Sequence, residues 1–140
     1  MKKKEPISNI MTRDVITLTL NDSLFDAERL FKKNHIRHIP VVENDKIIGM
    51  LSLTDLLRIS FVDSYNDVDV PPIDTAIYNM LSIGQIMVNS PEKVTSSSTI
   101  KEVAALLALK EFHALPVVDD ERLVGIITTT DLLNYLVDLY

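Results

Sequence analysis

The sequence predicts an α/β fold of two β-α-β-β-α repeats, packed together with pseudo-two-fold symmetry. The first observation is a duplication, because an offset of 76 aligns residues 7–57 with residues 83–133 without gaps. The second is that apolar and polar stretches follow the same order in both copies. One copy holds too few strands for a stable sheet, so two copies are needed to complete one core.

The identities between the two copies cluster at corresponding places rather than scattering along the alignment. They are Ile10–Met11 with Ile86–Met87, Pro40–Val42 with Pro116–Val118, Gly49 with Gly125, and Thr54–Leu57 with Thr130–Leu133. Such clustering is typical of an internal repeat and predicts three segments: a first repeat at 7–62, an acidic helical linker at 63–82, and a second repeat at 83–138.

Each repeat begins with an extended stretch, and a helix follows it. The helix starts are marked by Ser23 with Asp26 and by Thr99 with Glu102, the capping-box spacing that satisfies free N–H groups in the first turn. Each helix carries one apolar stripe, which predicts that one face packs on a core.

Two apolar, β-branched runs follow in each repeat and predict a hairpin buried on both faces. The extended stretches are Val15–Leu20 and Lys93–Ser96, and the hairpin strands are Ile39–Val42 with Ile47–Leu51 and Leu115–Val118 with Leu123–Ile127. A last helix is predicted to open at Thr54 or Thr130, whose hydroxyl would cap it, with the next Asp in the first turn.

The composition excludes several classes of protein. Hydrophobic residues make up 46% and charged residues 24%, which is typical of a folded globular protein. The net charge of −6 argues against a nucleic-acid polymer or an anionic membrane as partner. There is no Cys, and no run approaches the length of a membrane span, so we expect a cytoplasmic protein.

The sequence contains few of the motifs and residue pairs that catalysis requires. Only three Gly are present, and they are far apart, so the sequence contains neither the glycine-rich dinucleotide-binding motif nor a phosphate-binding loop. The three His all lie just before the Ile-Pro or Leu-Pro segment, and no nucleophile–base pair is evident. We therefore expect no enzyme activity and no obligatory cofactor.

The linker carries four aspartates around Pro71–Pro72, namely Asp63, Asp67, Asp69 and Asp74, before a predicted helix at Thr75–Leu81. Carboxylates are ligands for hard divalent cations, but the spacing fits no calcium loop. We expect a solvated acidic loop and no metal site, with a magnesium-responsive regulator as an alternative.

These motifs resemble a known family. The Ile-Met at the start of each unit, the Ile/Leu-Pro-Val-Val before the hairpin, and the Gly-x-x-Ser/Thr-x-Thr-Asp that opens the last helix are similar to tandem cystathionine-β-synthase (CBS) domains, the Bateman module. The resemblance covers about Ile7 to Leu136. It implies a non-catalytic module with two clefts between the repeats, which bind adenosine-containing ligands and regulate a partner protein.

The residues themselves support a ligand site at the start of each last helix. The carboxylates of Asp55 and Asp131 can each accept two hydrogen bonds from a ribose diol. Ser52 with Thr54, or Thr128 with Thr130, and the helix N-terminus offer donors to phosphate. The same residues are also ordinary helix caps, and the two roles can coexist.

A basic segment precedes the first hairpin, where His35, Arg37 and His38 could face phosphate, as the family resemblance implies. The alternative is a solvated turn. In the second repeat the same places hold Glu111, His113 and Ala114, so only His113 keeps a donor. His35 and Glu111 stand where the family usually has Gly, so we expect Asn34 to take the left-handed conformation.

The resemblance also implies an adenine pocket against the segment that enters each repeat. In the first repeat it comprises Val15, Ile16 and Thr17 with Ile39 and Pro40 opposite; in the second it comprises Pro91, Glu92 and Lys93 with Leu115 and Pro116. Glu92 departs from the apolar pattern, so the first pocket is better supported. Val15 and Ile16 are also ordinary strand residues.

The sequence therefore predicts a regulatory module that binds AMP, ADP, ATP or S-adenosylmethionine, with AMP or ATP favoured, and that controls an unidentified protein by changing shape. The alternative is a structural dimerisation module without a ligand. Apolar residues surround both last helices, which predicts a homodimer. A linker that folds back over the same surface would be the intramolecular alternative, through Ile73, Ile77, Tyr78 and Leu81.

Overall fold

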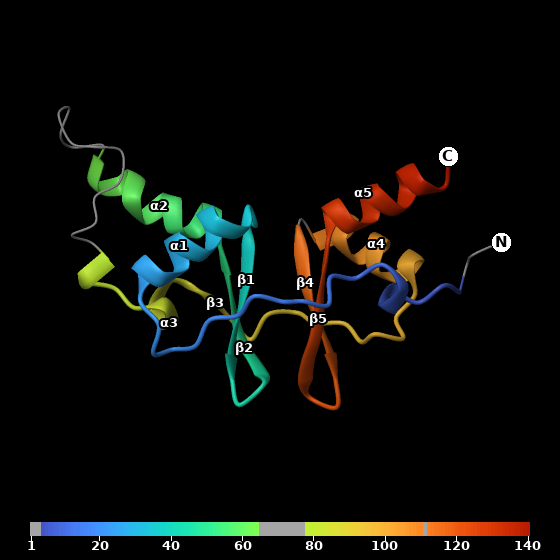
Figure 1. The fold of residues 1–140 in the computed structure, drawn as a ribbon, viewed down its shortest axis with the longest axis horizontal. Helices are drawn as coiled ribbons and strands as arrows, with labels where there is room; N and C mark the ends of the chain where they lie inside the picture. Colours follow the sequence, from blue (N-terminus) through green and yellow to red (C-terminus); the bar gives the residue numbers. More distant parts are fainter. Residues whose placement is uncertain (1–3, 65–77, 111) are drawn as a thin grey trace. The chain divides into compact units, whose positions relative to one another are not determined.

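The computed structural model describes residues 4–64, 78–110 and 112–140, which group into two compact units. The first-repeat unit comprises the described residues of Ile16–Asn44 and Ile48–Ser90. The second-repeat unit comprises those of Met1–Val15, Asp45–Ile47 and Pro91–Tyr140. Each unit holds helices packed on a small sheet, which confirms the predicted α/β class (Figure 1).

The first-repeat unit contains a sheet with the strand order β1-β2-β3. Its elements are α1 (Leu24–Asn34), β1 (His38–Glu43), β2 (Lys46–Ser52, of which Lys46 and Ile47 group with the other unit), α2 (Leu53–Ser64), α3 (Ile83–Ile86) and β3 (Val88–Asn89). The turn between β1 and β2 has Asn44 and Asp45 at φ 52° and 68°, a left-handed pair that Asn and Asp tolerate well. The predicted hairpin is confirmed.

The second-repeat unit repeats this order around the antiparallel pair β4-β5. Its elements are the 3-10 helix η1 (Ile7–Asn9), α4 (Ile100–Lys110), β4 (Ala114–Asp119), β5 (Arg122–Thr128) and α5 (Thr129–Asp138). Asp120 and Glu121 form the turn, with φ 51° and 68°. The middle residues of both hairpins are buried, as the apolar runs predicted.

The extended stretch that enters each repeat makes a single parallel bridge rather than a long strand. Leu18 pairs with Val41, and Val94 pairs with Val117. The Leu18 N–H donates to the Pro40 carbonyl at 3.0 Å, and the Val94 N–H donates to the Pro116 carbonyl at 3.1 Å. Equivalent backbone atoms therefore hold both entering segments.

The segments that open the two sequence repeats are exchanged between the units. Thr12 pairs with Ile126 in the second-repeat unit, whereas Val88 pairs with Met50 in the first-repeat unit. Ile7 and Ile83, equivalent in the alignment, are each completely buried in the unit of the other repeat. The predicted boundaries follow the order of the chain and do not show this exchange.

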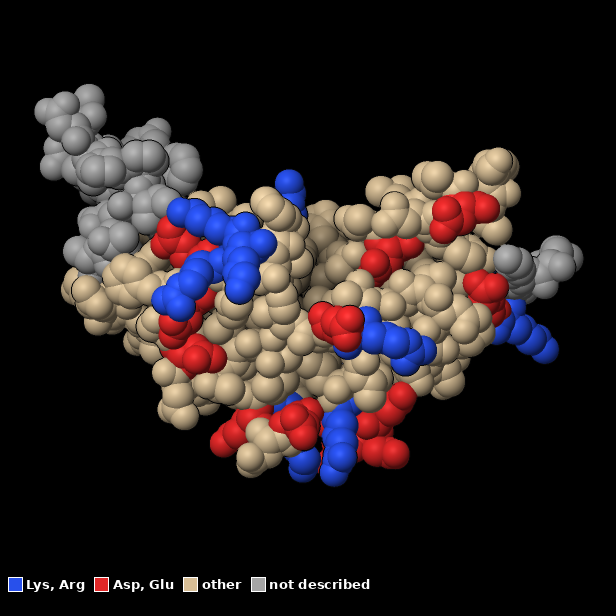
Figure 2. Space-filling model, viewed as in Figure 1, with Lys and Arg blue, Asp and Glu red and all other residues tan. Residues whose placement is uncertain are grey.

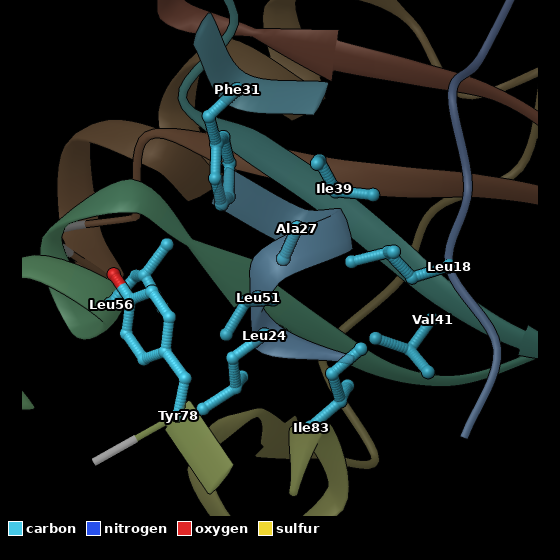
Figure 3. Packing of buried hydrophobic residues seen from close by; sticks show 10 residues of the cluster. All are labelled: Leu18, Leu24, Ala27, Phe31, Ile39, Val41, Leu51, Leu56, Tyr78 and Ile83. Atoms are coloured by element: carbon cyan, nitrogen blue, oxygen red, sulfur yellow. The ribbon is translucent and has the colours of Figure 1, made fainter. Parts of the chain in front are cut away.

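Each unit has its own hydrophobic core. In the first-repeat unit, α1 and the sheet close around ten buried residues (Figure 3): Leu18, Leu24, Ala27, Phe31, Ile39, Val41, Leu51, Leu56, Tyr78 and Ile83. In the second-repeat unit the buried set is Ile7, Met11, Ile100, Val103, Leu107, Leu115, Val117 and Ile127. Burying one such large side chain contributes about 1.5–3 kcal/mol, so each core is a substantial source of stability.

The helix starts follow the predicted capping boxes at α1 and α4. The Asp26 N–H donates to Ser23 Oγ at 3.1 Å, and the Ser23 N–H donates to the Asp26 carboxylate at 2.9 Å. At α4, the Glu102 N–H donates to Thr99 Oγ1 at 3.1 Å. Both interactions satisfy backbone donors that would otherwise have no partner in the first turn.

The linker was predicted at 63–82, and most of it lies outside the described residues. The undescribed residues include Asp67, Asp69 and Asp74, and the first three residues of the predicted helix Thr75–Leu81. Tyr78 is described, is 4% exposed, and meets Phe25 edge-on with ring centroids 5.1 Å apart. The end of the linker is therefore anchored in the core of the first-repeat unit.

Candidate functional site

In each unit the entry to the hairpin lies beside the start of the last helix. The Leu53 N–H, at the start of α2, donates to the Arg37 carbonyl at 2.8 Å. The Thr129 N–H, at the start of α5, donates to the His113 carbonyl at 3.0 Å. The structure thus brings the predicted basic segment of each repeat to a helix N-terminus, where backbone N–H groups favour an anion.

The predicted caps Thr54 and Thr130 are wrong, because both helices start earlier. The Asp55 N–H donates to Ser52 Oγ at 3.0 Å, and the Asp131 N–H donates to Thr128 Oγ1 at 3.1 Å. Ser52 and Thr128 are the last strand residues, and the spacing of three residues to Asp allows the cap to form there. Thr54 and Thr130 are instead exposed within the first turn.

The two aspartates differ in their contacts. The Thr128 N–H donates to Asp131 Oδ2 at 3.0 Å, which completes a capping box. Thr12 Oγ1 lies 3.2 Å from Asp131 Oδ1 and 3.4 Å from Oδ2. Asp55 Oδ1 lies 3.7 Å from a guanidinium nitrogen of Arg58, whose side chain is 71% exposed. Asp131 is therefore fixed by short contacts, whereas Asp55 has a long ion pair with a solvated side chain.

Sequence reasoning did not find Thr12. The available signal was its place in the alignment, where the offset of 76 sets Thr12 against Val88. A hydroxyl facing a carboxylate in one copy and an isopropyl group in the other is a difference in chemistry. The contact between Thr12 and Asp131 could not be predicted from local sequence, because the two residues are 119 positions apart.

The predicted adenine segments lie against the strands that they were expected to face. Ile39 and Pro40 are buried in β1, and Leu115 and Pro116 are buried in β4. The bridge at Leu18 sets the preceding Ile16 and Thr17 beside β1, with Ile16 half-buried and Thr17 exposed. Lys93, just before the bridge at Val94, is exposed.

The basic segment of the first repeat turns at His35. His35 caps α1 with φ 54° and ψ 40°, so it takes the left-handed conformation itself, and the prediction for Asn34 is wrong. Asn34 remains in the helix and donates from Nδ2 to the Leu30 carbonyl at 3.0 Å. This bond keeps Asn34 helical and moves the turn one residue along. Arg37 is exposed after the turn, and His38 is half-buried.

The second repeat has less positive charge at the same place. His113 is exposed and is followed by half-buried Ala114, and Glu111 lies outside the described residues. On the face drawn in Figure 2, Lys and Arg side chains gather over α1, where Arg29, Lys32 and Lys33 are exposed. Of these, Arg29 and Lys32 contact acidic residues on the same helix.

No group of three or more His, Asp or Glu side chains is close enough to hold a metal ion within the described part of the chain. The linker aspartates lie outside that part or have undescribed side chains, so the magnesium alternative remains a prediction. Among the described helices, none combines the length and apolarity required to span a bilayer.

Comparison with known proteins identifies the family. The model of the CBS domain matches twice, at residues 7–61 and 83–138. The chain belongs to the CBS domain family. The predicted resemblance is therefore confirmed, and the two matches make the chain a tandem CBS pair.

Several relatives share most of this CBS pair. Protein MJ1426 of Methanocaldococcus jannaschii is 30% identical over 153 residues, which cover 94% of this chain and 90% of that protein. Protein MJ1225 of the same organism is 30% identical over 135 residues, or 95% of this chain. The chain spans about half the length of MJ1225, since the match covers 48% of it.

Solved structures share the CBS-pair fold. The crystal structure of MJ1225 from Methanocaldococcus jannaschii superposes with a TM-score of 0.80 at 29% identity, over 97% of this chain and 49% of that one. CBSX2 in complex with AMP gives a TM-score of 0.78 at 24% identity, over 96% and 98% of the two chains. The CBS pair of protein MJ0100, in complex with 5′-methylthioadenosine and S-adenosyl-L-methionine, gives 0.75 at 23% identity, over 94% and 98%.

Proposed function

We propose that this CBS pair is a regulatory module that binds an adenosine-containing nucleotide beside the N-termini of α2 and α5, and that it controls a partner protein by changing conformation. The complexes of CBSX2 and MJ0100 support this class of ligand for the fold. The observation that carries the proposal lies in this chain. In each unit an aspartate in the first turn, the helix N-terminus and the hairpin entry lie together, held by equivalent backbone and side-chain hydrogen bonds.

The aspartate would hold the ribose. A carboxylate accepts both donors of a 2′,3′-diol, and Asp55 is half-buried in the first turn of α2, where its position is fixed by the bond to Ser52. Ser52 and Thr54 would offer hydroxyls beside it. In the second-repeat unit the equivalent groups are Asp131, Thr128 and Thr130.

The apolar strand residues would form the adenine wall. Ile39 and Pro40 are buried in β1, and Ile16 enters beside them, with backbone groups of Thr17 available for the purine edge. Leu115 and Pro116 would take this role in the second-repeat unit, where Lys93 replaces Thr17. An apolar wall with a few polar groups is the usual form of a small-molecule site.

The basic side chains would contact phosphate. Arg37 follows the turn at His35, its carbonyl is bonded to the start of α2, and its exposed guanidinium can bind phosphate with two hydrogen bonds. His38 would add charge when protonated. The second hairpin entry has His113 and Ala114 in place of Arg37 and His38, and its entering segment carries the exposed Lys93, so we propose that the two sites differ in phosphate preference, with AMP or ATP favoured at the first.

The direct test is calorimetry with AMP, ADP, ATP and S-adenosylmethionine, on the native chain and on Asp55→Ala. We expect the variant to lose at least about tenfold in affinity, since hydrogen bonds to a charged group are worth roughly 1.5–3 kcal/mol. Asp26→Ala is the matched control, because Asp26 occupies the same capping position in α1 away from the proposed site. Equal losses in the two variants, or none in Asp55→Ala, would assign Asp55 to capping alone.

A second test separates the phosphate role. Arg37→Ala is expected to weaken AMP more than adenosine, because only the nucleotide loses a charge-assisted pair. Arg29→Ala, on the exposed face of α1, serves as the control for a lost positive charge. Equal losses for adenosine and AMP would refute the assignment of Arg37.

We also propose that two chains associate through α5. Leu133, Leu136 and Val137 are 61%, 50% and 71% exposed, although Leu132 and Tyr135 on the same helix pack on the core. In Figure 2 the outer surface of α5 is tan apart from isolated acidic side chains. The intramolecular alternative is that the linker folds over this apolar surface. Two of its residues, Tyr78 and Leu81, instead pack in the core of the first-repeat unit.

Light scattering tests this association. The native chain is expected to give twice the chain mass of 15.8 kDa at high micromolar concentration. Leu136→Asp is expected to restore the monomer, because a buried charge without a partner is costly. Asn134→Asp adds the same charge at another exposed position of α5 and should leave a dimer through the Leu136 face intact. A native monomer at all concentrations would refute this proposal without affecting nucleotide binding.

A further inference from the structure

The two copies differ at one residue beside the aspartate. Thr12 and Val88 occupy equivalent positions and are held in equivalent backbone pairs, Thr12 with Ile126 and Val88 with Met50. The Thr12 N–H and carbonyl each make a 2.9 Å hydrogen bond to Ile126. The backbone thus fixes Thr12 in place, and its hydroxyl is the group that meets the Asp131 carboxylate.

This contact uses part of the hydrogen-bonding capacity of Asp131. The carboxylate accepts from the Thr128 N–H at 3.0 Å and from Thr12 Oγ1 at 3.2 Å. A carboxylate offers about four acceptor positions. A ribose diol would therefore compete with Thr12 for the positions that the Thr128 N–H does not occupy. In the first-repeat unit Val88 has no donor to place there, and the Arg58 side chain near Asp55 is free to move in solvent.

The residues around the two aspartates also differ, and the second entering segment carries the exposed Lys93 where the first has Thr17. The first-repeat unit has Arg37 and His38 at the hairpin entry, whereas the second has His113 and Ala114. The segment entering the first repeat is apolar at Ile16, whereas its equivalent is the charged and exposed Glu92. The first site therefore combines a carboxylate paired with the solvated Arg58, the exposed guanidinium of Arg37 and an apolar residue in the entering segment.

We infer that the Asp55 site is the single high-affinity nucleotide site of the chain. The Thr12 hydroxyl, by its hydrogen bond to Asp131, keeps that carboxylate in a structural role. The inference rests on the proposed function, because it assigns the nucleotide to one of the two proposed sites. The difference between Thr12 and Val88 would then determine the ratio of nucleotide affinities of the two proposed sites.

The experiment exchanges these two residues. AMP binding is measured by calorimetry on the native chain, on Thr12→Val and on Val88→Thr, with Asp55→Ala added to each to isolate the second site. Thr12→Val preserves the side-chain shape and the backbone bonds to Ile126, so the fold is retained. The native chain is expected to bind one AMP tightly.

Thr12→Val is expected to strengthen the second site by about fivefold, the factor that corresponds to one typical hydrogen bond. Val88→Thr is expected to weaken the first site by a similar factor. Two equal sites in the native chain, or an unchanged second site in Thr12→Val, would overturn the inference and leave the proposed function standing. No binding of any adenosine ligand to the native chain would overturn the proposed function itself, and the inference with it.

Discussion

Gly125 in β5 has no room for a side chain, which makes it a sharp test of how the N-terminal segment is held. A Cβ at this position would lie 2.8 Å from Met11 Sδ and 2.9 Å from the Thr12 carbonyl oxygen. The thioether can move, but the carbonyl is fixed by its hydrogen bond from Ile126. Gly125→Ala must therefore push the segment carrying Thr12 away from β5.

The expected cost follows from two opposing effects. Overpacking a fixed site costs about 1–3 kcal/mol. Replacing a strand glycine by alanine recovers roughly 0.5–1 kcal/mol, because the unfolded chain loses conformational freedom. The free energy of unfolding should fall by about 1–2 kcal/mol, a shift of about 3–6 °C in Tm for a chain of this size. Urea denaturation followed by circular dichroism measures it.

The duplication supplies the control. A Cβ at the equivalent Gly49 would meet only the side chain of Met87, at 2.2, 2.9 and 3.0 Å from its Sδ, Cγ and Cε atoms. In a double-mutant cycle, Met87→Ala should relieve most of the cost of Gly49→Ala, whereas Met11→Ala should relieve only part of the cost of Gly125→Ala. Equal relief in the two cycles, or a Gly125→Ala variant as stable as the native chain, would refute this account of the Thr12 contact.

Three further predictions concern stability alone. Hydrogen bonds from the Ser96 hydroxyl and amide lower the pKa of Asp119, so this carboxylate stabilises the fold above about pH 4 and the stabilisation is lost as the pH falls below that value. Ser96→Ala should therefore flatten the acid side of a stability-versus-pH curve, and an unchanged curve would contradict the assignment. Tyr78→Ala should lower the free energy of unfolding by about 3 kcal/mol, since a buried aromatic side chain is lost, and a change below about 1 kcal/mol would show that the linker end is not anchored. Ser23→Ala should cost about 1 kcal/mol by removing the cap of α1, as measured by the same denaturation, and no change would show that the observed bond to Asp26 adds nothing.

The features predictable from the sequence are those set by neighbouring residues. The capping boxes at Ser23 and Thr99 depend on a spacing of three residues, and the hairpins depend on apolar runs separated by short polar turns. The errors are small shifts of the same local features. The caps of α2 and α5 fall two residues before Thr54 and Thr130, and the left-handed turn falls on His35 instead of Asn34.

The features that the sequence did not reveal depend on distant residues. Alignment of the copies shows that Ile7 and Ile83 are equivalent, but it does not show which unit each one enters. The exchange of the two opening segments is set by long-range backbone pairs, such as Thr12 with Ile126. The Thr12–Asp131 contact follows from this exchange, so a prediction from local pattern had no access to it.

Several backbone contacts and helix caps recur between the units, whereas some side-chain contacts are made in one unit alone among the described residues. The bridges of Leu18 and Val94 repeat, as do the bonds that hold Leu53 and Thr129. In contrast, the bonds from Ser96 to Asp119 have no counterpart, because the equivalent residues are Leu20 and Glu43. Because these backbone contacts are shared, we expect side chains that differ between the copies, such as Thr12 and Val88, to set a difference in nucleotide affinity between the two proposed sites. Exchange of single residues between copies, in one chain and one assay, can therefore assign that difference residue by residue.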